Sequence, residues 1–284
     1  MVDAKTTLCC IIGDPVEHSL SPAMHNAGYK ALGLNWVYTA FRVEDVAAAV
    51  AGIRALGIRG SSVTIPHKLA VIPHLDRLDP VAEWIGSVNT IINDGGDLVG
   101  TNTDGAGAMK ALLDAGVTLA GKRVLVLGSG GGARAVAITL AARAGIGSME
   151  ILGVIEDELE KLGADVRDKA GADCEWSMLD EGSLKKAVER SDVLVHCTPV
   201  GMHPKVDGSV VPEDLFRPEL SVMDIVYNPR ETRLLSFAKK AGCTTVHGLD
   251  MLFNQGVLQF EAWTGQEAPE KEMRKALESW MAKS

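Results

Sequence analysis

Several features are scarce in this 284-residue sequence, and each shortage excludes a class of protein. Its five cysteines are odd in number and include no C-x-x-C pair, so reduced thiols and a cytoplasmic location are expected rather than a disulfide framework. Its histidines lack the close His and Cys grouping of a zinc site, so no metal is expected. No stretch approaches the ~20 apolar residues of a membrane span, and no signal peptide is recognisable, so no membrane association is expected.

Positive charge is also in short supply. The chain has 28 Lys and Arg against 37 Asp and Glu, a net charge of −9. No face can gather a large cationic excess, which argues against nucleic acid as a partner but leaves a local site for a small molecule possible. The apolar content of 46% is typical of a soluble globular protein, and the length suits about two domains. Nothing in the sequence indicates an oligomeric state.

One stretch, residues 61–68, combines a strand end with a single lysine. Val63 and Ile65 are β-branched residues of the strand type, and Pro66 prevents the strand from continuing. Lys68 then falls at the start of the next helix and is the candidate for proton transfer. The alternative is an ordinary solvated surface cation, which most lysines are.

Three further stretches favour a functional site around Lys68. They are rich in hydroxyl and amide groups, and each lies between a strand-like and a helix-like run: residues 19–22, 87–90 and 101–104. Each also has a plainer explanation. Ser21 before Pro22 is equally typical of a helix N-cap, and Asp104 of an acid that merely opens a helix.

The amino-terminal part alternates between strand-like and helix-like segments. The expected strands are residues 8–12, 36–41 and 58–65, and the expected helices between them are residues 22–32 and 46–56. Such alternation predicts a parallel sheet with helices on both faces and working loops at the carboxyl ends of the strands. Two helices at 69–75 and 80–85 and a hairpin at Asp94-Gly95-Gly96 follow.

A glycine-rich turn after a buried strand marks a second α/β unit. The expected strand over residues 123–127 runs into Gly128-Ser129-Gly130-Gly131-Gly132-Ala133, which opens a helix to Ala144, and a further strand follows at 149–152. Backbone without side chains can approach a pyrophosphate, and the first helical turn offers unpaired N–H groups. A lone glycine triplet often marks only a tight turn, but in this frame it predicts a nucleotide site. The alternation continues to about residue 249, and the tail is helical.

Ordered motifs cover nearly the whole chain. They are Gly13-x-Pro15-Val16-x-His18-Ser19-x-Ser21-Pro22-x-x-His25-Asn26, Val63-Thr64-Ile65-Pro66-His67-Lys68, Val88-Asn89-Thr90, Asn102-Thr103-Asp104-Gly105, Thr198-Pro199-Val200-Gly201-Met202, Asp224-Ile225-Val226-Tyr227-Asn228-Pro229 and Gly248-Leu249-Asp250-Met251-Leu252-Phe253-Asn254-Gln255. Together they resemble the shikimate dehydrogenase family of aromatic amino-acid biosynthesis. Such an ordered set is more specific than any single glycine loop.

The resemblance implies a two-domain α/β fold. A substrate-binding catalytic domain with a parallel-rich sheet would comprise residues 1–105 and 250–284, the carboxyl-terminal helices returning to it. A Rossmann-like dinucleotide-binding domain would comprise residues 106–249. The implied reaction is the reversible reduction of the 3-keto group of 3-dehydroshikimate by NAD or NADP, with the substrate lying in the cleft.

The resemblance also implies roles for individual residues. Lys68 would exchange the proton with the substrate oxygen, and Asp104 would orient Lys68 and bind a substrate hydroxyl. The other substrate-binding residues would be Thr64, Asn89 and Gln255 for hydroxyls and Ser19, Ser21 and Tyr227 for the carboxylate. The cofactor-binding residues would be Gly128, Ser129, Gly130, Gly131, Gly132, Ala133, Arg134, Thr198, Val226 and Gly248.

The sequence departs from the family pattern at a few positions. Ser62 stands where asparagine is most common, and His196-Cys197 where Asn-Ala is usual. The largest departure is residues 153–158, where Val154 and three acids replace an Asn-Arg-Thr stretch that grips the 2′-phosphate of NADP. These acids are equally typical of a helix start, but the absence of arginine does not depend on that choice, and Arg134 is the only nearby candidate for a substitute clamp. NAD is therefore expected to be used at least as well as NADP.

Two rival functions are compatible with the same motifs. A quinate dehydrogenase, or a mixed quinate/shikimate dehydrogenase, would share the fold and the pair of Lys68 and Asp104. A catalytically silent nucleotide-binding sensor would share the scaffold. Retention of both residues counts against the sensor, because a binding module needs no proton donor.

Overall fold

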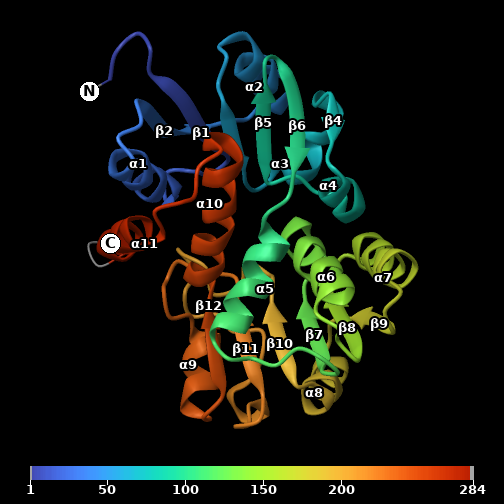
Figure 1. Ribbon diagram of the computed structural model, residues 1–284. Helices are drawn as coiled ribbons and strands as arrows, with labels where there is room; N and C mark the ends of the chain where they lie inside the picture. Colours follow the sequence, from blue (N-terminus) through green and yellow to red (C-terminus); the bar gives the residue numbers. More distant parts are fainter. Residues whose placement is uncertain (1, 282–284) are drawn as a thin grey trace. The chain divides into compact units, whose positions relative to one another are not determined.

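The computed structural model describes residues 2–281 and divides the chain into two compact units (Figure 1). One unit contains the chain up to Thr103 and from Gln255 onward, and the other is Asp104–Asn254. The sequence had placed these divisions after residues 105 and 249. The first division instead coincides with the start of helix α5 (Asp104–Asp114), and the second lies inside helix α10 (Gly248–Thr264).

The first unit is built on a mixed sheet with the strand order β2-β1-β3-β5-β6-β4. Its strands are β1 (Thr7–Gly13), β2 (Trp36–Arg42), β3 (Gly60–Val63), β4 (Arg77–Leu78), β5 (Thr90–Asp94) and β6 (Asp97–Thr101). β1 runs parallel to β2 and β3, and β4 parallel to β6, whereas β5 is antiparallel to β3 and β6. The predicted hairpin is confirmed, because Gly95 and Gly96 adopt positive φ between β5 and β6.

The helices of the first unit correct two details of the sequence interpretation. They are α1 (Ser21–Ala31), α2 (Val46–Ala55), α3 (His67–Ala70), the 3₁₀ turn η1 (Ile72–His74), α4 (Pro80–Ile85), the later part of α10, and α11 (Glu270–Met281). The helix expected over 69–75 is broken into α3 and η1, since Pro73 cannot continue an α-helix. Ser21 is not the N-cap of α1. It is the first helical residue, and its N–H donates to Ser19 Oγ at 3.3 Å.

Aromatic side chains pack α10 against the sheet of the first unit. The His25 ring stacks on Tyr38 at 4.5 Å between centroids and lies 5.2 Å from the ring of Trp263. Trp263 is 1% exposed, and its Nε1 donates to Ile91 O at 3.0 Å. A Cβ added at Gly60 would lie only 2.2 Å from that Nε1. The helix can therefore reach the sheet only because β3 begins with glycine.

The second unit is built on a parallel sheet in the order β12-β11-β10-β7-β8-β9. Its strands are β7 (Arg123–Leu127), β8 (Ser148–Gly153), β9 (Cys174–Met178), β10 (Val193–His196), β11 (Ser221–Asp224) and β12 (Thr244–His247). This order is that of the doubly wound dinucleotide fold, in which the order of the strands along the sheet reverses between β7 and β10. The edge strand β9 was not predicted, because of its five residues only Cys174 is buried and no apolar run marks it.

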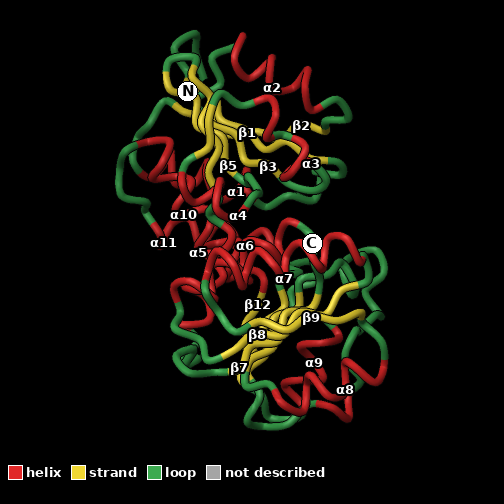
Figure 2. Tube along the Cα trace, turned by 90° about the vertical axis from the view of Figure 1, so that its right-hand side faces the viewer, coloured by secondary structure: helices red, strands yellow, loops and turns green. Residues whose placement is uncertain are grey.

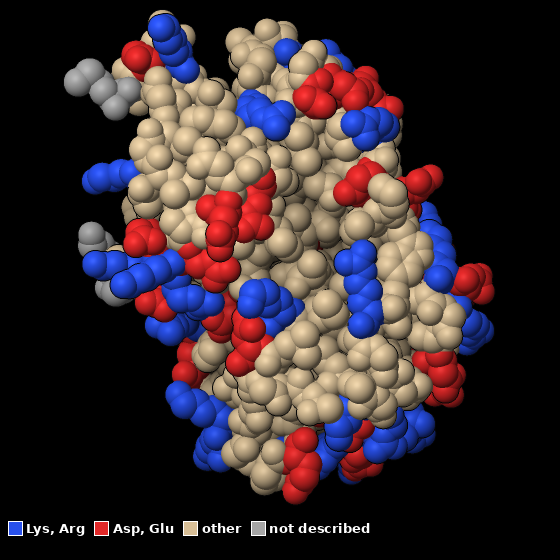
Figure 3. Space-filling view, in the orientation of Figure 1, with Lys and Arg blue, Asp and Glu red and all other residues tan. Residues whose placement is uncertain are grey.

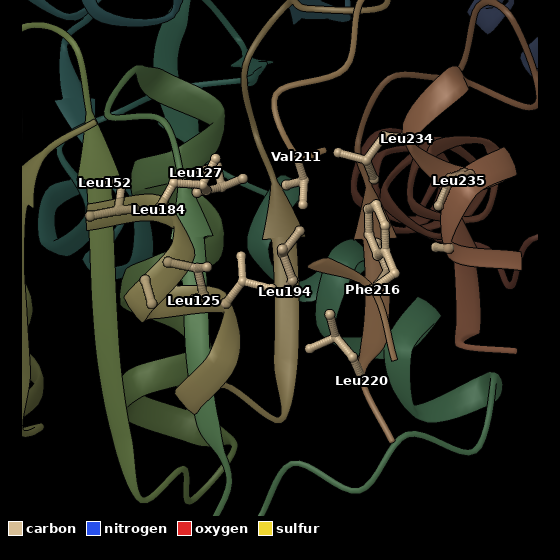
Figure 4. Packing of buried hydrophobic residues seen from close by; sticks show 14 residues of the cluster. Leu125, Leu127, Leu152, Leu184, Leu194, Val211, Phe216, Leu220, Leu234 and Leu235 are labelled. Atoms are coloured by element: carbon tan, nitrogen blue, oxygen red, sulfur yellow. The ribbon is translucent and has the colours of Figure 1, made fainter. Parts of the chain in front are cut away.

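Helices cover both faces of this second sheet. They are α5, α6 (Gly131–Arg143), α7 (Glu156–Ala170), α8 (Glu181–Arg190) and α9 (Arg233–Lys240), with a 3₁₀ turn η2 (Glu213–Leu215). Figure 2 shows α5, α6 and α7 on one face and α8 and α9 on the other. Under α8 and α9, leucines of the strands and helices meet in one buried cluster that includes Leu125, Leu194 and Leu234 (Figure 4). This cluster holds the central strands of the unit in place.

The surface shows no field of a single charge on the face drawn in Figure 3, where Lys and Arg are interspersed with Asp and Glu. This mixture accords with the net charge of −9. Among the described residues, no helix combines the length and apolar character needed to cross a membrane.

Gly60 provides a test of how tightly α10 packs. We expect Gly60→Ala to destabilise the protein by about 1–3 kcal/mol, because the new methyl group must displace buried Trp263. Gly52→Ala is the matched control. Its Cβ would meet no atom within 4 Å among the described residues, and replacing a helical glycine should stabilise by about 0.5–1 kcal/mol. Urea unfolding of both variants measures the difference, and equal effects would contradict the packing.

Candidate active site

Lys68 is held at the carboxyl edge of the first unit's sheet. β3 ends at Val63, and the next backbone N–H, that of Thr64, donates to Ile12 O at 3.0 Å. His67 N then donates to Thr64 O at 2.9 Å, and Val88 N donates to Lys68 O at 2.9 Å. The turn that carries Lys68 is therefore fixed to β1 on one side and to the segment before Asn89 on the other. Its side chain is half-buried.

Hydroxyl groups predicted to bind substrate lie at the same edge. Thr64 packs so closely on the end of β1 that a Cβ added at Gly13 would lie 2.3 Å from Thr64 Cγ2. Ser19 lies in the loop between β1 and α1, and Ser21 is the first residue of α1 and is 2% exposed. Because β1 and β3 are parallel neighbours, the segments after them emerge at one edge of the sheet.

Amide groups complete this edge. Asn89 is 2% exposed, and its backbone O accepts from Val63 N at 2.7 Å, which ties it to β3. Its side-chain Nδ2 donates to Thr103 Oγ1 at 2.9 Å and to Gln255 Oε1 at 3.3 Å. The structure therefore brings Asn89 and Gln255 together, although 166 residues separate them in the sequence.

The remaining predicted substrate residues belong to the second unit. Asp104 is the first residue of α5 and is 5% exposed. A Cβ added at the adjacent Gly105 would lie 2.3 Å from Ala135 O, so glycine allows α5 to pack closely on α6. Tyr227 lies three residues beyond the end of β11, and burial raises its pKa to about 12. At neutral pH its hydroxyl is therefore protonated and can donate.

The glycine loop has the geometry that a pyrophosphate requires. Gly128 has φ +115°, and a Cβ there would lie 3.1 Å from Cys197 O. Gly130 is the N-cap of α6, and among the described residues no atom lies within 4 Å of where its Cβ would be. Open space thus faces the positive end of a 13-residue helix. The residues present fit a dinucleotide at this turn.

Arg134, the candidate for a substitute phosphate clamp, is engaged with an acid of the second unit. It is 7% exposed and forms an ion pair with Asp165 of α7, a carboxylate that Lys169 also approaches to 3.2 Å. Burial alone would raise the pKa of Asp165, but the hydrogen bonds from Arg134 and Lys169 outweigh it and hold the pKa below its usual value. Arg134 therefore joins α6 to α7.

The three acids after β8 begin a helix, which was the simpler of the two explanations for them. Glu156, Asp157 and Glu158 form the first turn of α7, a favourable place for negative charge. Glu158 also reaches the glycine loop, since its Oε2 accepts from Ser129 Oγ at 3.3 Å. Val154 is 68% exposed. The structure thus puts a carboxylate beside the loop and an apolar side chain at the position of the missing arginine.

One buried hydrogen-bond network was not predicted from the sequence. His196 Nδ1 lies 2.9 Å from Asp224 Oδ1, and its Nε2 is hydrogen-bonded to Thr198 Oγ1. Asp224 also accepts from Thr232 Oγ1 at 2.6 Å and from Val226 N at 2.9 Å. His196 and Asp224 are fully buried. The unusual His196 was visible as a signal, but nothing local linked it to an acid 28 residues away.

These observations define a class of protein. The second unit has a doubly wound parallel sheet, with a glycine loop after β7, where the strand order reverses. The first unit presents lysine, amides and hydroxyls. Together these features are those of an NAD(P)-dependent oxidoreductase acting on a CH–OH group. Comparison with known proteins makes this specific. The chain belongs to the shikimate dehydrogenase family.

The comparisons cover the full length. The shikimate dehydrogenase substrate binding domain matches residues 11–91, and the shikimate 5′-dehydrogenase C-terminal domain matches residues 248–278. Shikimate dehydrogenase (NADP(+)) of Moorella thermoacetica is 46% identical over 288 residues, which cover 100% of this chain and 96% of that protein.

Two solved structures have the same fold. A shikimate dehydrogenase in complex with NADP+ has a TM-score of 0.92 at 39% identity, covering 99% of this chain and 98% of its own. Shikimate 5-dehydrogenase from Listeria monocytogenes in complex with shikimate and NAD has a TM-score of 0.89 at 38% identity, covering 97% and 98%. These likenesses confirm the predicted two-domain α/β class.

The buried pair of His196 and Asp224 can be tested by stability. We expect Asp224→Asn to destabilise the protein by about 1–3 kcal/mol, because an amide NH₂ cannot accept the bonds that the carboxylate accepts. Asp168→Asn, an exposed change in α7, should leave stability within about 0.5 kcal/mol. Thermal unfolding compares the two variants, and equal melting temperatures would refute the role given to Asp224.

Proposed function

We propose that this chain catalyses the reversible NAD(P)-dependent reduction of 3-dehydroshikimate to shikimate. The observation that carries the proposal is the gathering of neutral hydroxyl and amide groups at the sheet edge that holds Lys68, notably Asn89 bonded to Gln255. Hydroxyls of a substrate need neutral donors and acceptors of this kind. Full-length similarity to shikimate dehydrogenases supports the same substrate.

Proton transfer falls to Lys68. A bound nicotinamide supplies the hydride chemistry, and a ketone that gains hydride leaves an alkoxide that needs a proton. The ammonium of Lys68 donates this proton, and its neutral amine accepts it in the reverse direction. Asp104 orients Lys68 and binds a substrate hydroxyl, and the hydroxyls of Ser19, Ser21 and Tyr227 hold the carboxylate without an arginine.

The choice of cofactor is the finer part of the proposal, and we propose that NAD is used at least as well as NADP. A 2′-phosphate needs cations, and here Arg134 is engaged by Asp165 while Val154 stands where an arginine would be. Glu158 at the loop would repel a phosphate and can accept a hydrogen bond from a ribose hydroxyl. The names of the relatives favour NADP, whereas the Listeria structure holds NAD with shikimate.

Quinate is the second candidate substrate. The observation that favours it is the fold, which quinate dehydrogenase from Corynebacterium glutamicum in complex with NAD shares with a TM-score of 0.88 at 29% identity. Turnover measured with shikimate and with quinate separates the two activities. Absence of hydride transfer with either compound would leave the nucleotide-binding sensor as the better function.

Lys68→Ala should lower turnover about 10²- to 10⁴-fold while shikimate still binds, because the lysine acts on the developing alkoxide more than on the ground state. Lys5→Ala, an exposed change, is the control for the loss of a positive charge. Steady-state kinetics and equilibrium binding of shikimate check the result. A Lys68→Ala variant that keeps more than about a third of wild-type turnover would rule out the assignment.

Specificity constants for NAD and NADP at saturating shikimate test the cofactor. We expect the wild type to show no preference for NADP beyond about tenfold, which corresponds to about 1.4 kcal/mol. Val154→Arg should raise the NADP to NAD ratio by supplying the missing cation at an exposed position. Val154→Leu, which adds bulk without charge, should not. A strong NADP preference in the wild type would show that another group binds the 2′-phosphate.

A further inference from the structure

A chain of buried hydrogen bonds runs through the first unit and ends at the amides of the proposed substrate site. Tyr38 Oη donates to Ser62 Oγ at 2.6 Å, and Ser62 Oγ donates to Gln259 Oε1 at 2.8 Å. Gln259 Nε2 donates to Thr90 Oγ1 at 2.8 Å, and Thr90 Oγ1 donates to Asn89 Oδ1 at 2.7 Å. Asn89 Nδ2 then donates to Gln255 Oε1 at 3.3 Å. Every link lies within one compact unit.

Backbone groups fix the direction of this chain, because Asn89 O can only accept and faces Gln259 Nε2 at 3.2 Å, and Thr103 N can only donate and faces Asn89 Oδ1 at 2.9 Å. A phenol or an alcohol has one proton to donate, so once Tyr38 donates to Ser62, the proton of Ser62 is available for Gln259 Oε1. That contact turns the NH₂ of Gln259 towards Thr90 and towards Asn89 O, which accepts from it at 3.2 Å. Gln259 is 1% exposed, and a reversed amide would place its oxygen against the carbonyl oxygen of Asn89.

The same logic orients the two amides at the site. Asn89 Oδ1 accepts from Thr90 Oγ1 and from Thr103 N, at 2.7 and 2.9 Å, so the NH₂ of Asn89 faces the other way. The NH₂ of Asn89 donates to Gln255 Oε1. The amide of Gln255 is thereby oriented with its oxygen towards Asn89 and its NH₂ on the opposite side. Reversal of either amide would exchange a donor for an acceptor where a substrate hydroxyl must bind.

The starting residues of the chain are particular to this sequence. Ser62 stands where the family mostly has asparagine, whose amide would bring donors of its own. The smaller serine lies within hydrogen-bond distance of both Tyr38 and Gln259. Burial raises the pKa of Tyr38, and its hydrogen bond to Ser62 acts in the opposite direction.

We propose that Tyr38, Ser62 and Gln259 are positioning residues for substrate recognition, which act by holding the amides of Asn89 and Gln255 in one orientation. The inference rests on the proposed function, because it takes Asn89 and Gln255 as the groups that bind substrate hydroxyls. It adds residues that touch no substrate in that proposal. It also gives a physical reason for serine at position 62.

The test compares KM for shikimate in Tyr38→Phe, Ser62→Ala and Gln259→Glu with that of the wild type. Ser62→Ala should raise KM about tenfold, and Tyr38→Phe less, because Ser62 keeps its proton for Gln259. Gln259→Glu should have the largest effect, since a carboxylate still accepts from Ser62 but has no proton for Thr90. KM for the cofactor should not change in any of them.

Ser61→Ala is the matched control. Ser61 is the buried neighbour of Ser62 on the same strand, but its hydroxyl donates to Ser62 O at 3.1 Å and lies outside the chain. A purely structural role would lower the melting temperature and the amount of active enzyme, and it would leave KM unchanged because KM does not depend on enzyme concentration. Two results would overturn the inference. In one, the variants of Tyr38, Ser62 and Gln259 have the same KM for shikimate as Ser61→Ala. In the other, their KM values for shikimate and for the cofactor rise together.

Wild-type activity separates this inference from the proposed function. If the wild type oxidises quinate and not shikimate, the proposed function fails, and the same comparison of KM is made with quinate. If the wild type is active and the chain variants resemble Ser61→Ala, only the positioning role fails. A wild type inactive with both compounds overturns both.

Discussion

The need to satisfy a buried amide organises the first unit. Asn89 is almost fully buried, and each of its polar atoms must find a partner where water cannot supply one. Its partners come from β3, from Thr103 and from α10. The turn that bears Lys68 is bonded to the residue directly before Asn89, so the lysine and the amides form one connected edge. Local strand and turn geometry alone would not unite them.

In the second unit, the corresponding constraint is the open backbone of the glycine loop. Glycine at 128 and 130 removes side chains where β7 meets α6. The neighbouring strand β10 ends at His196 and the next strand, β11, ends at Asp224, and these two residues form a buried pair. Because β7 and β10 are adjacent, Thr198 and Val226 are held close to the sheet edge from which the glycine loop emerges.

Electrostatics link this architecture to the choice of cofactor. The ion pair of Arg134 and Asp165 is nearly buried, and separating it would leave a charge without compensation. That cost keeps the guanidinium of Arg134 beside Asp165 of α7. Glu158 meanwhile gains from the helix N-terminus and lies beside Ser129. The same helix that stabilises the unit therefore also sets the charge next to the glycine loop.

The sequence by itself determined the features that depend on local chemistry. The alternating β-branched strands, the turn at Pro66, the glycine hairpin and the glycine loop could all be predicted, because proline restricts the backbone and glycine permits conformations that other residues avoid. Tertiary structure alone decided which distant groups pair: Arg134 with Asp165 across 31 residues, His196 with Asp224 across 28, and Ser62 with Gln259 across 197. It also decided the edge strand β9, whose exposed residues carry no apolar pattern. Such pairings depend on burial, and burial exists only once the chain has folded.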